Sequence, residues 1–185
     1  MMMKRLLSIT ISIASLVILA GCTTPQDRPQ ITDQTAPMTT TKTLTSKQIS
    51  QLSYLIEEEK LAHDIYTTLG EQRDNKQFTN IPQSEAQHRF LMAQILENYN
   101  IPNPTNDKTG VFTNPELTAL YNTLLTQGKQ NAQEAIKVGI AIEQKDIADI
   151  EKMMPWFVDY PDIQSVLEKL LQWSRNHLKA FQRAL

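Results

Sequence analysis

The sequence predicts an all-α fold in which four long helices form two hairpins. From residue 46 onward, apolar side chains recur with the 3.6-residue period of an amphipathic helix. No convincing alternation of apolar and polar residues, the pattern of a half-buried strand, interrupts this period. About 28 residues separate the second long segment from the third, which is more than a simple helical hairpin needs.

The first two long segments predict an antiparallel hairpin. One runs over about 46–70, with Ser46 as its candidate N-cap and Gly70 as its C-terminal stop. The next runs over about 82–100 and has Pro82 in its first turn, a position where helices tolerate proline.

The second half of the chain repeats this arrangement after a long crossover. A stretch rich in Pro and Asn is followed by a short helix through 116–127, closed by Gly128. Long helices are then expected over 129–154 and from Pro161 onward. Two helical hairpins joined by one long crossover are typical of ferritin-like four-helix bundles, so this is the architecture that we expect.

The start of the chain has the properties of a targeting segment. Residues 1–21 combine two basic residues, Lys4 and Arg5, with an uncharged apolar run over Leu6–Ala20. That run is shorter than the roughly 20 apolar residues that span a bilayer. It ends in Leu19-Ala20-Gly21-Cys22, which resembles the lipobox of bacterial lipoproteins. An ordinary signal peptide with an incidental cysteine is the alternative.

The lipobox resemblance implies cleavage before Cys22, lipidation of that residue and a lipid anchor in a membrane. The expected location is then the cell envelope outside the cytoplasm, at the outer membrane or the cell surface. Residues 22–45 are rich in Thr, Pro and Gln and contain no aromatic residue, so they are expected to form a flexible tether. The remaining residues, 46–185, suffice for one folded domain.

Composition excludes several functional classes. A single cysteine allows neither an internal disulfide nor a thiolate metal site. Only five glycines are present, and no dinucleotide-binding or P-loop motif occurs. The net charge of −2 offers no basic field for nucleic acid, so no nucleic-acid partner is expected.

Charged and imidazole side chains interrupt the apolar stripes of the four long segments. A buried carboxylate without a partner is very unfavourable, so several acids that face one interior require cations. Carboxylate and imidazole together suit iron or manganese, and zinc is an alternative. Two iron ions match four carboxylates in charge and are the cofactor that we expect. The candidate metal ligands are Glu59, Glu85, His88, Glu143, Asp146 and His177.

The spacing of these residues supports a metal centre. Glu85 and His88 are three residues apart and therefore lie on one helix face. This is the Glu-x-x-His motif of di-iron carboxylate bundles. The pattern Glu59-x-x-Ala62-x-x-x-Tyr66 resembles the first helix of rubrerythrins, in which that Glu is a ligand.

Further motifs resemble the ferritin-like domain of unknown function 2202. Glu57-Glu58-Glu59-Lys60-Leu61-Ala62 followed by Asp64-Ile65-Tyr66 is similar to its opening signature. Gly110-Val111-Phe112 and Ile142-Glu143 with Asp146-Ile147 are similar to its middle, and Asn176-His177-Leu178 with Phe181 to its close. The resemblance covers essentially 46–185 and implies a ferritin-like bundle with metal binding but no particular reaction.

One position departs from a complete di-iron pattern. Ser174 stands three residues before His177, where the fourth helix would carry a Glu. If Asp146 does not supply the missing carboxylate, the alternative is a mononuclear centre or a weak second metal position. Ser174, Tyr66 and Tyr99 are candidates for hydrogen bonds to the ligands, with core packing as the other role of the tyrosines.

Five further residues are kept outside the candidate site. Glu57 and Glu58 are expected to be solvated because they point away from the apolar stripe. Trp156 and Trp173 are expected to be packing residues. His63 lies one turn beyond Glu59 and is left out of the ligand set, since a place beside the ligands or at the end of the bundle suits it as well.

Three functions are consistent with the sequence. The first is a membrane-tethered di-metal protein that acts on peroxide or dioxygen and needs an external reductant, because no Cys-x-x-Cys relay is present. The second is a non-catalytic metal-buffering envelope protein. The third is a metal-free helical interaction module. The oligomeric state is left open, but the tether argues against a storage cage.

The Cys22→Ser variant tests the anchor. Expressed in a bacterial host that lipidates such proteins, it should lose incorporation of radiolabelled fatty acid and leave the membrane fraction, since the acylated thiol is gone. An exchange of the neighbouring Thr24 to Ser should change neither property. Undiminished labelling of the Cys22→Ser protein would contradict the lipoprotein assignment.

Overall fold

The computed structural model describes residues 42–72 and 75–185. The expected signal segment, Cys22 and most of the tether lie outside the described residues. The described part is all-helical. It contains α1 (Ser46–Gly70), α2 (Lys76–Asn98), α3 (Pro115–Gly128), α4 (Ala132–Met153), the short 3-10 helix η1 (Met154–Phe157) and α5 (Pro161–Gln182).

The first helix has the predicted bounds but a different cap. Thr45, not Ser46, is the N-cap of α1: its hydroxyl accepts from the backbone N–H of Gln48, and the Gln48 side chain accepts from the backbone N–H of Thr45. This reciprocal pair is a capping box, which fixes the start of the helix.

The second helix begins earlier than predicted. Asn75 is the N-cap of α2 and accepts a hydrogen bond of 2.9 Å from the backbone N–H of Gln77. Pro82 therefore lies inside the helix and not in its first turn. Burial of Phe78 and Ile81 in the additional turns stabilises this longer helix.

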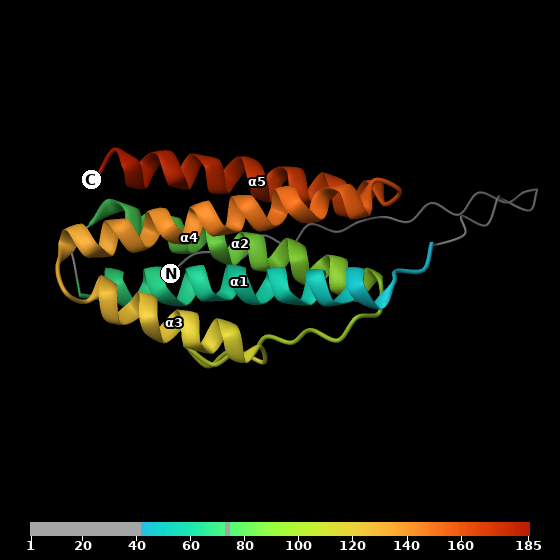
Figure 1. Cartoon of the computed structure of the whole chain (residues 1–185), viewed down its shortest axis with the longest axis horizontal. Helices are drawn as coiled ribbons and strands as arrows, with labels where there is room; N and C mark the ends of the chain where they lie inside the picture. Colours follow the sequence, from blue (N-terminus) through green and yellow to red (C-terminus); the bar gives the residue numbers. More distant parts are fainter. Residues whose placement is uncertain (1–41, 73–74) are drawn as a thin grey trace, which may run out of the picture. The chain divides into compact units, whose positions relative to one another are not determined.

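The four long helices pack as two hairpins. Helix α1 packs along α2 and α4 packs along α5, while α2 also contacts α5 and α1 contacts α4. The connection after α2 runs back along this assembly, so that α4 follows the direction of α2 (Figure 1). Helix α3 forms part of this connection and packs against α1 and α4. Among the described helices, none combines the length and apolar character needed to cross a bilayer.

The apolar interior is divided into two clusters. One contains Leu52, Leu55 and Ile56 of α1 together with Met92, Ile150, Leu167 and Leu170 of the other long helices. The second contains Leu61 and Ile65 of α1 together with Phe78, Ile81, Ile142 and Phe181. On each long helix, buried or nearly buried polar side chains lie between its two apolar blocks: Glu57–Lys60 on α1, Glu85 and His88 on α2, Glu143 and Asp146 on α4, and Ser174 and His177 on α5. The core is therefore interrupted by a polar band at one level of all four helices.

Buried charges of α1 hold the crossover in place. The ammonium group of Lys60 pairs with Asp64 and donates to the backbone carbonyl of Lys108. Asp64 also accepts a 2.9 Å hydrogen bond from the N–H of Gly110, which has a positive φ of 73°. A side chain at Gly110 would also meet the ring of Tyr121, so both conformation and space favour glycine there.

Glu57 has a similar role and corrects a prediction. It was expected to be solvated, but its side chain is buried and accepts from the backbone N–H groups of Thr113 and Asn114, just before α3. Burial of this carboxylate is tolerated because two backbone donors satisfy it.

The close approach of α4 and α5 depends on Gly139. A Cβ added there would lie 2.5 Å from Cε1 of the buried Phe181 ring. Gly139→Ala should lower the free energy of unfolding, because overpacking costs about 1–3 kcal/mol, whereas the helix propensity of Ala returns only about 1 kcal/mol. Urea unfolding measures the difference. Exchange of the exposed Gln144 of α4 to Ala is the control, and a stabilised Gly139→Ala variant would contradict this account of the packing.

Candidate metal centre

The polar band brings together the six predicted ligands. Of these, five are almost entirely buried and His177 is about one-eighth exposed at its side chain, 12%. Helix α1 supplies Glu59, α2 supplies Glu85 and His88, α4 supplies Glu143 and Asp146, and α5 supplies His177. Every long helix therefore contributes to one buried group of side chains.

Glu85 and the two histidines form the centre of this group. His88 Nδ1 lies 2.9 Å from Glu85 Oε2, and His177 Nδ1 lies 2.9 Å from Glu85 Oε1. Each of the three residues offers a ligand atom within 4.8 Å of the others. Glu59 and Glu143 extend the group: Glu59 Oε2 lies 3.0 Å from His88 Nδ1, and Glu143 Oε1 lies 3.7 Å from His177 Nδ1.

Several side-chain oxygen and nitrogen atoms of the band are buried without a hydrogen-bond partner. They are Glu58 Oε2, Glu59 Oε1, Glu85 Oε1, Asp146 Oδ1 and His177 Nδ1. His177 Nδ1 is close to Glu85 Oε1 without the geometry of a hydrogen bond. Unsatisfied buried acceptors are costly, and a cation would satisfy them together. The residues present therefore fit a metal ion.

Hydroxyl groups orient two of the carboxylates. The Tyr66 hydroxyl donates to Glu143 Oε1 at 2.7 Å, and the Ser174 hydroxyl donates to Asp146 Oδ2. Both lie beside the group, as the sequence suggested. Each hydroxyl leaves the other oxygen of its carboxylate available, which is how residues behind metal ligands commonly act.

Tyr99 does not join the group, which corrects the prediction. Its hydroxyl donates to Asp162 Oδ1 at 2.9 Å, and its ring packs beside Tyr160. The helical period alone placed Tyr99 on the inward stripe of α2, but α2 ends at Asn98 and Tyr99 only caps it.

Trp173 packs as expected, and its partner is a candidate ligand. Its ring stacks on His88 with centroids 5.0 Å apart and planes 7° apart, and His177 stacks on the same imidazole at 5.5 Å. This stacking fixes the plane of the His88 ring. His63 lies apart from the group: its Nδ1 contacts Asp64 Oδ1 at 3.2 Å, and 28% of its side chain is exposed.

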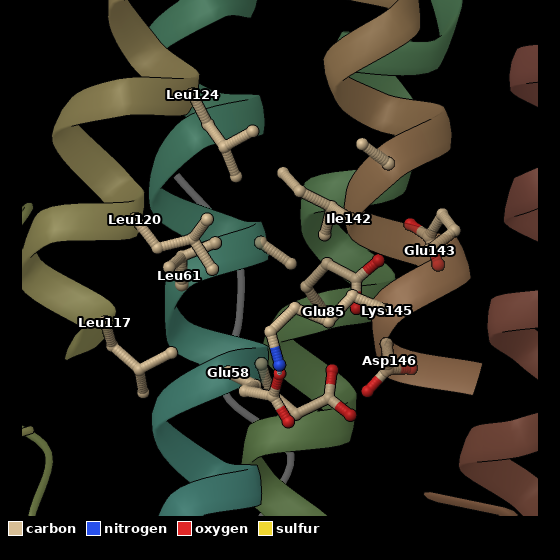
Figure 2. A pocket seen from close by; sticks show the side chains of 13 residues that line it. Glu58, Leu61, Glu85, Leu117, Leu120, Leu124, Ile142, Glu143, Lys145 and Asp146 are labelled. Carbon is tan, nitrogen blue, oxygen red and sulfur yellow. Dashed lines mark hydrogen bonds and ion pairs between the residues drawn. The ribbon is translucent and has the colours of Figure 1, made fainter. Parts of the chain in front are cut away.

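Glu58 is a member of the polar band that sequence reasoning missed. It was expected to be solvated, yet its carboxylate is buried and accepts a 2.6 Å hydrogen bond from the ammonium group of Lys145. Helix α3 explains the difference, because it covers the side of α1 that a bundle of four helices would leave in solvent (Figure 2). A stripe of leucines on the expected short helix was the available signal.

The charges in the band act strongly on one another. Burial and the charge of Glu85 raise the pKa of Glu143 to about 7. Burial raises the pKa of Glu58 to about 8, although Lys145 opposes this. Burial disfavours a charged His88, but the carboxylates of Glu59 and Glu85 outweigh it and raise the pKa of His88 to about 11. Bound protons on these three side chains therefore offset part of the negative charge of the band.

The opposite shift occurs at the centre of the group. Burial disfavours the charged form of Glu85, but His88 and His177 outweigh it and lower the pKa of this carboxyl to about 2. The carboxylates of Glu85 and Glu143 overcome the burial of His177 and raise its pKa to about 9. A carboxylate that stays ionised between two imidazoles is a suitable anchor for a metal ion.

The fold and the site define a class: helical domains with a buried carboxylate–histidine cluster that fits a metal ion. The chain belongs to the family of the uncharacterized protein domain DUF2202, whose model matches residues 48–185.

The chain is also similar to a relative in sequence and to solved structures. The uncharacterized protein MJ0754 of Methanocaldococcus jannaschii is 46% identical over 132 residues, which cover 70% of each protein. The crystal structure of hypothetical protein MJ0754 from Methanococcus jannaschii has a TM-score of 0.75 at 42% identity, over 78% of this chain and 82% of that one. A DUF305 fragment from Deinococcus radiodurans has a TM-score of 0.58 at 13% identity, over 77% of this chain and 97% of that one, which is a likeness of fold alone.

The metal-free protein should become less stable as pH rises from about 5 to about 8. Folding raises the pKa of Glu58, Glu143, His88 and His177. Their contribution to the free energy of unfolding is fully present below the pKa of the unfolded chain, 4.5 for Glu and 6.5 for His. It is lost as the pH rises from there through the pKa of the folded protein. The lowered pKa of Glu85 acts in the opposite sense only below 4.5. Urea unfolding after chelation measures the trend, and greater stability at the higher pH would contradict it.

Proposed function

We propose that the chain is a ferritin-like protein with a non-haem di-metal centre, foremost a di-iron centre, that acts on peroxide or dioxygen outside the cytoplasm. The observation that carries the proposal is the buried convergence of Glu85, His88 and His177, whose ligand atoms lie within 4.8 Å of one another. Two helical hairpins joined by a long crossover support the ferritin-like assignment.

The residues fall into two groups by chemistry. Glu85, His88 and His177 offer oxygen and nitrogen donors for one ion, while Glu59, Glu143 and Asp146 offer oxygen donors for a second. Two iron ions would supply the reversible electron transfer that reduction of peroxide or dioxygen requires. Manganese suits the same donors, and zinc would make the centre redox-inactive.

The chain's own residues prepare this environment. The Tyr66 hydroxyl keeps its proton and donates a hydrogen bond to Glu143, which fixes the rotation of that carboxylate. Ser174 does the same for Asp146. The two apolar clusters enclose the band from both sides and exclude bulk water, so charge interactions at the centre are weakly screened.

The remaining parts of the proposal rest on the sequence. A lipid anchor at Cys22 would hold the domain at a membrane surface. The chain has a single cysteine, so electrons would come from an external reductant. A metal-buffering protein is the second candidate, because the same buried donors would bind a metal ion whether or not that ion reacts.

Metal analysis of the full-length protein tests the proposal. The double variant Glu85→Ala/His88→Ala should lose most of the iron or manganese that the wild type retains after gel filtration, because the centre of the cluster is removed. The matched controls are Glu97→Ala, at an exposed position, and His63→Ala, at a partly exposed one, and both variants should keep the metal.

Two outcomes would count against the proposal. Absence of stoichiometric metal from the wild type, or unchanged metal content in the double variant, would leave the helical interaction module as the better account. If metal binds but the reduced, iron-loaded protein is not oxidised by peroxide or dioxygen, metal buffering is favoured over redox chemistry.

A further inference from the structure

A cavity between α1, α3 and α4 adjoins the candidate ligands on the side that α3 covers (Figure 2). Its volume is about 80 Å³. Four of the six candidate ligands belong to its lining: Glu59, Glu85, Glu143 and Asp146. The cavity therefore offers a small molecule a place next to the proposed centre.

The wall of the cavity that faces these carboxylates is apolar. It is formed by Leu61, Leu117, Leu120, Leu124 and Ile142. None of these side chains can form a hydrogen bond. The other two charged residues of the lining, Glu58 and Lys145, pair with each other at 2.6 Å. The wall thus gives an ion or a strongly hydrated molecule no partner, and burial without a partner is unfavourable.

Two alanines leave this space open. Ala62 of α1 is buried, Ala141 of α4 is exposed, and both line the cavity. Protein interiors are close-packed, and an empty space forgoes contacts between its walls. A space kept beside buried carboxylates therefore points to an occupant. Since Ala141 is exposed and Leu120 is partly exposed, the cavity reaches the surface between α3 and α4.

The volume limits the occupant. An apolar cavity of about 150 Å³ holds benzene or xenon. The cavity here has about 80 Å³ and suits a smaller guest, such as a diatomic molecule. Dioxygen is uncharged and needs no hydrogen bond. Hydrogen peroxide donates and accepts hydrogen bonds, which the leucine wall does not return.

We propose that this cavity binds dioxygen and admits it to the candidate ligands past Leu120 and Ala141. The inference rests on the proposed function and narrows its substrate from peroxide or dioxygen to dioxygen. Occupation of the cavity by an apolar guest does not itself require a metal.

Xenon tests the cavity on crystals of the chelator-treated, full-length protein, because apolar cavities bind this gas. An anomalous xenon peak is expected beside Leu117, Leu120 and Ile142. Ala141→Trp places a large ring at the opening and should remove most of that peak. Gln144→Trp, at an exposed position of the same helix outside the lining, is the matched control and should keep it.

Oxidation of the reduced, iron-loaded protein tests the route. Ala141→Trp should slow oxidation by dioxygen severalfold, whereas Gln144→Trp should match the wild type. Oxidation by peroxide should be slowed less, because peroxide does not depend on the apolar wall.

The outcomes separate this inference from the proposed function. Wild-type crystals with no xenon in the cavity would overturn the inference and leave the metal centre untouched, since this measurement involves no metal and no variant. Loss of the xenon peak in Ala141→Trp with an unchanged rate of oxidation by dioxygen would also overturn it. Xenon in the cavity of a wild type that retains no iron or manganese would overturn the proposed function, and with it the role of dioxygen.

Discussion

The burial of carboxylates at one level of four helices is the constraint on which this structure depends. Five acids of the band, Glu58, Glu59, Glu85, Glu143 and Asp146, are buried together, and the cations beside them are two imidazoles and one ammonium group. Charges of one sign in a low-dielectric interior repel one another strongly. The fold tolerates them because protons, Lys145 and hydroxyl donors compensate in part, and a metal ion would complete the compensation.

The rest of the architecture serves this band. The apolar clusters on either side supply the burial that stabilises the helices, while the band itself contributes little stability without a metal. Helix α3 and the crossover are attached to α1 by Glu57, Lys60 and Asp64, which lie next to the candidate ligands in sequence. One stretch of α1 thus links the position of the crossover to the geometry of the centre. An ion that binds only the folded chain would stabilise both.

The helices and the central residues could be predicted from the sequence because both follow from the helical period. Glu85 and His88 had to share a face, and the bounds of α1 were confirmed. The period could not show that α3 covers α1, so Glu57 and Glu58 were wrongly expected in solvent. The helical period also does not show where α2 ends, and Tyr99 was therefore wrongly expected beside the candidate ligands. Such features depend on tertiary packing and on caps such as Asn75, which the spacing of apolar residues does not encode.

The central claim is that the buried band holds metal ions between the four helices. Anomalous diffraction from crystals of the full-length protein loaded with iron or manganese tests it most directly, with data collected on both sides of the absorption edge of the metal. The account predicts an anomalous peak within bonding distance of Glu85, His88 and His177. A loaded crystal with no peak in the band, or with its only peak at the surface near His63, would contradict it.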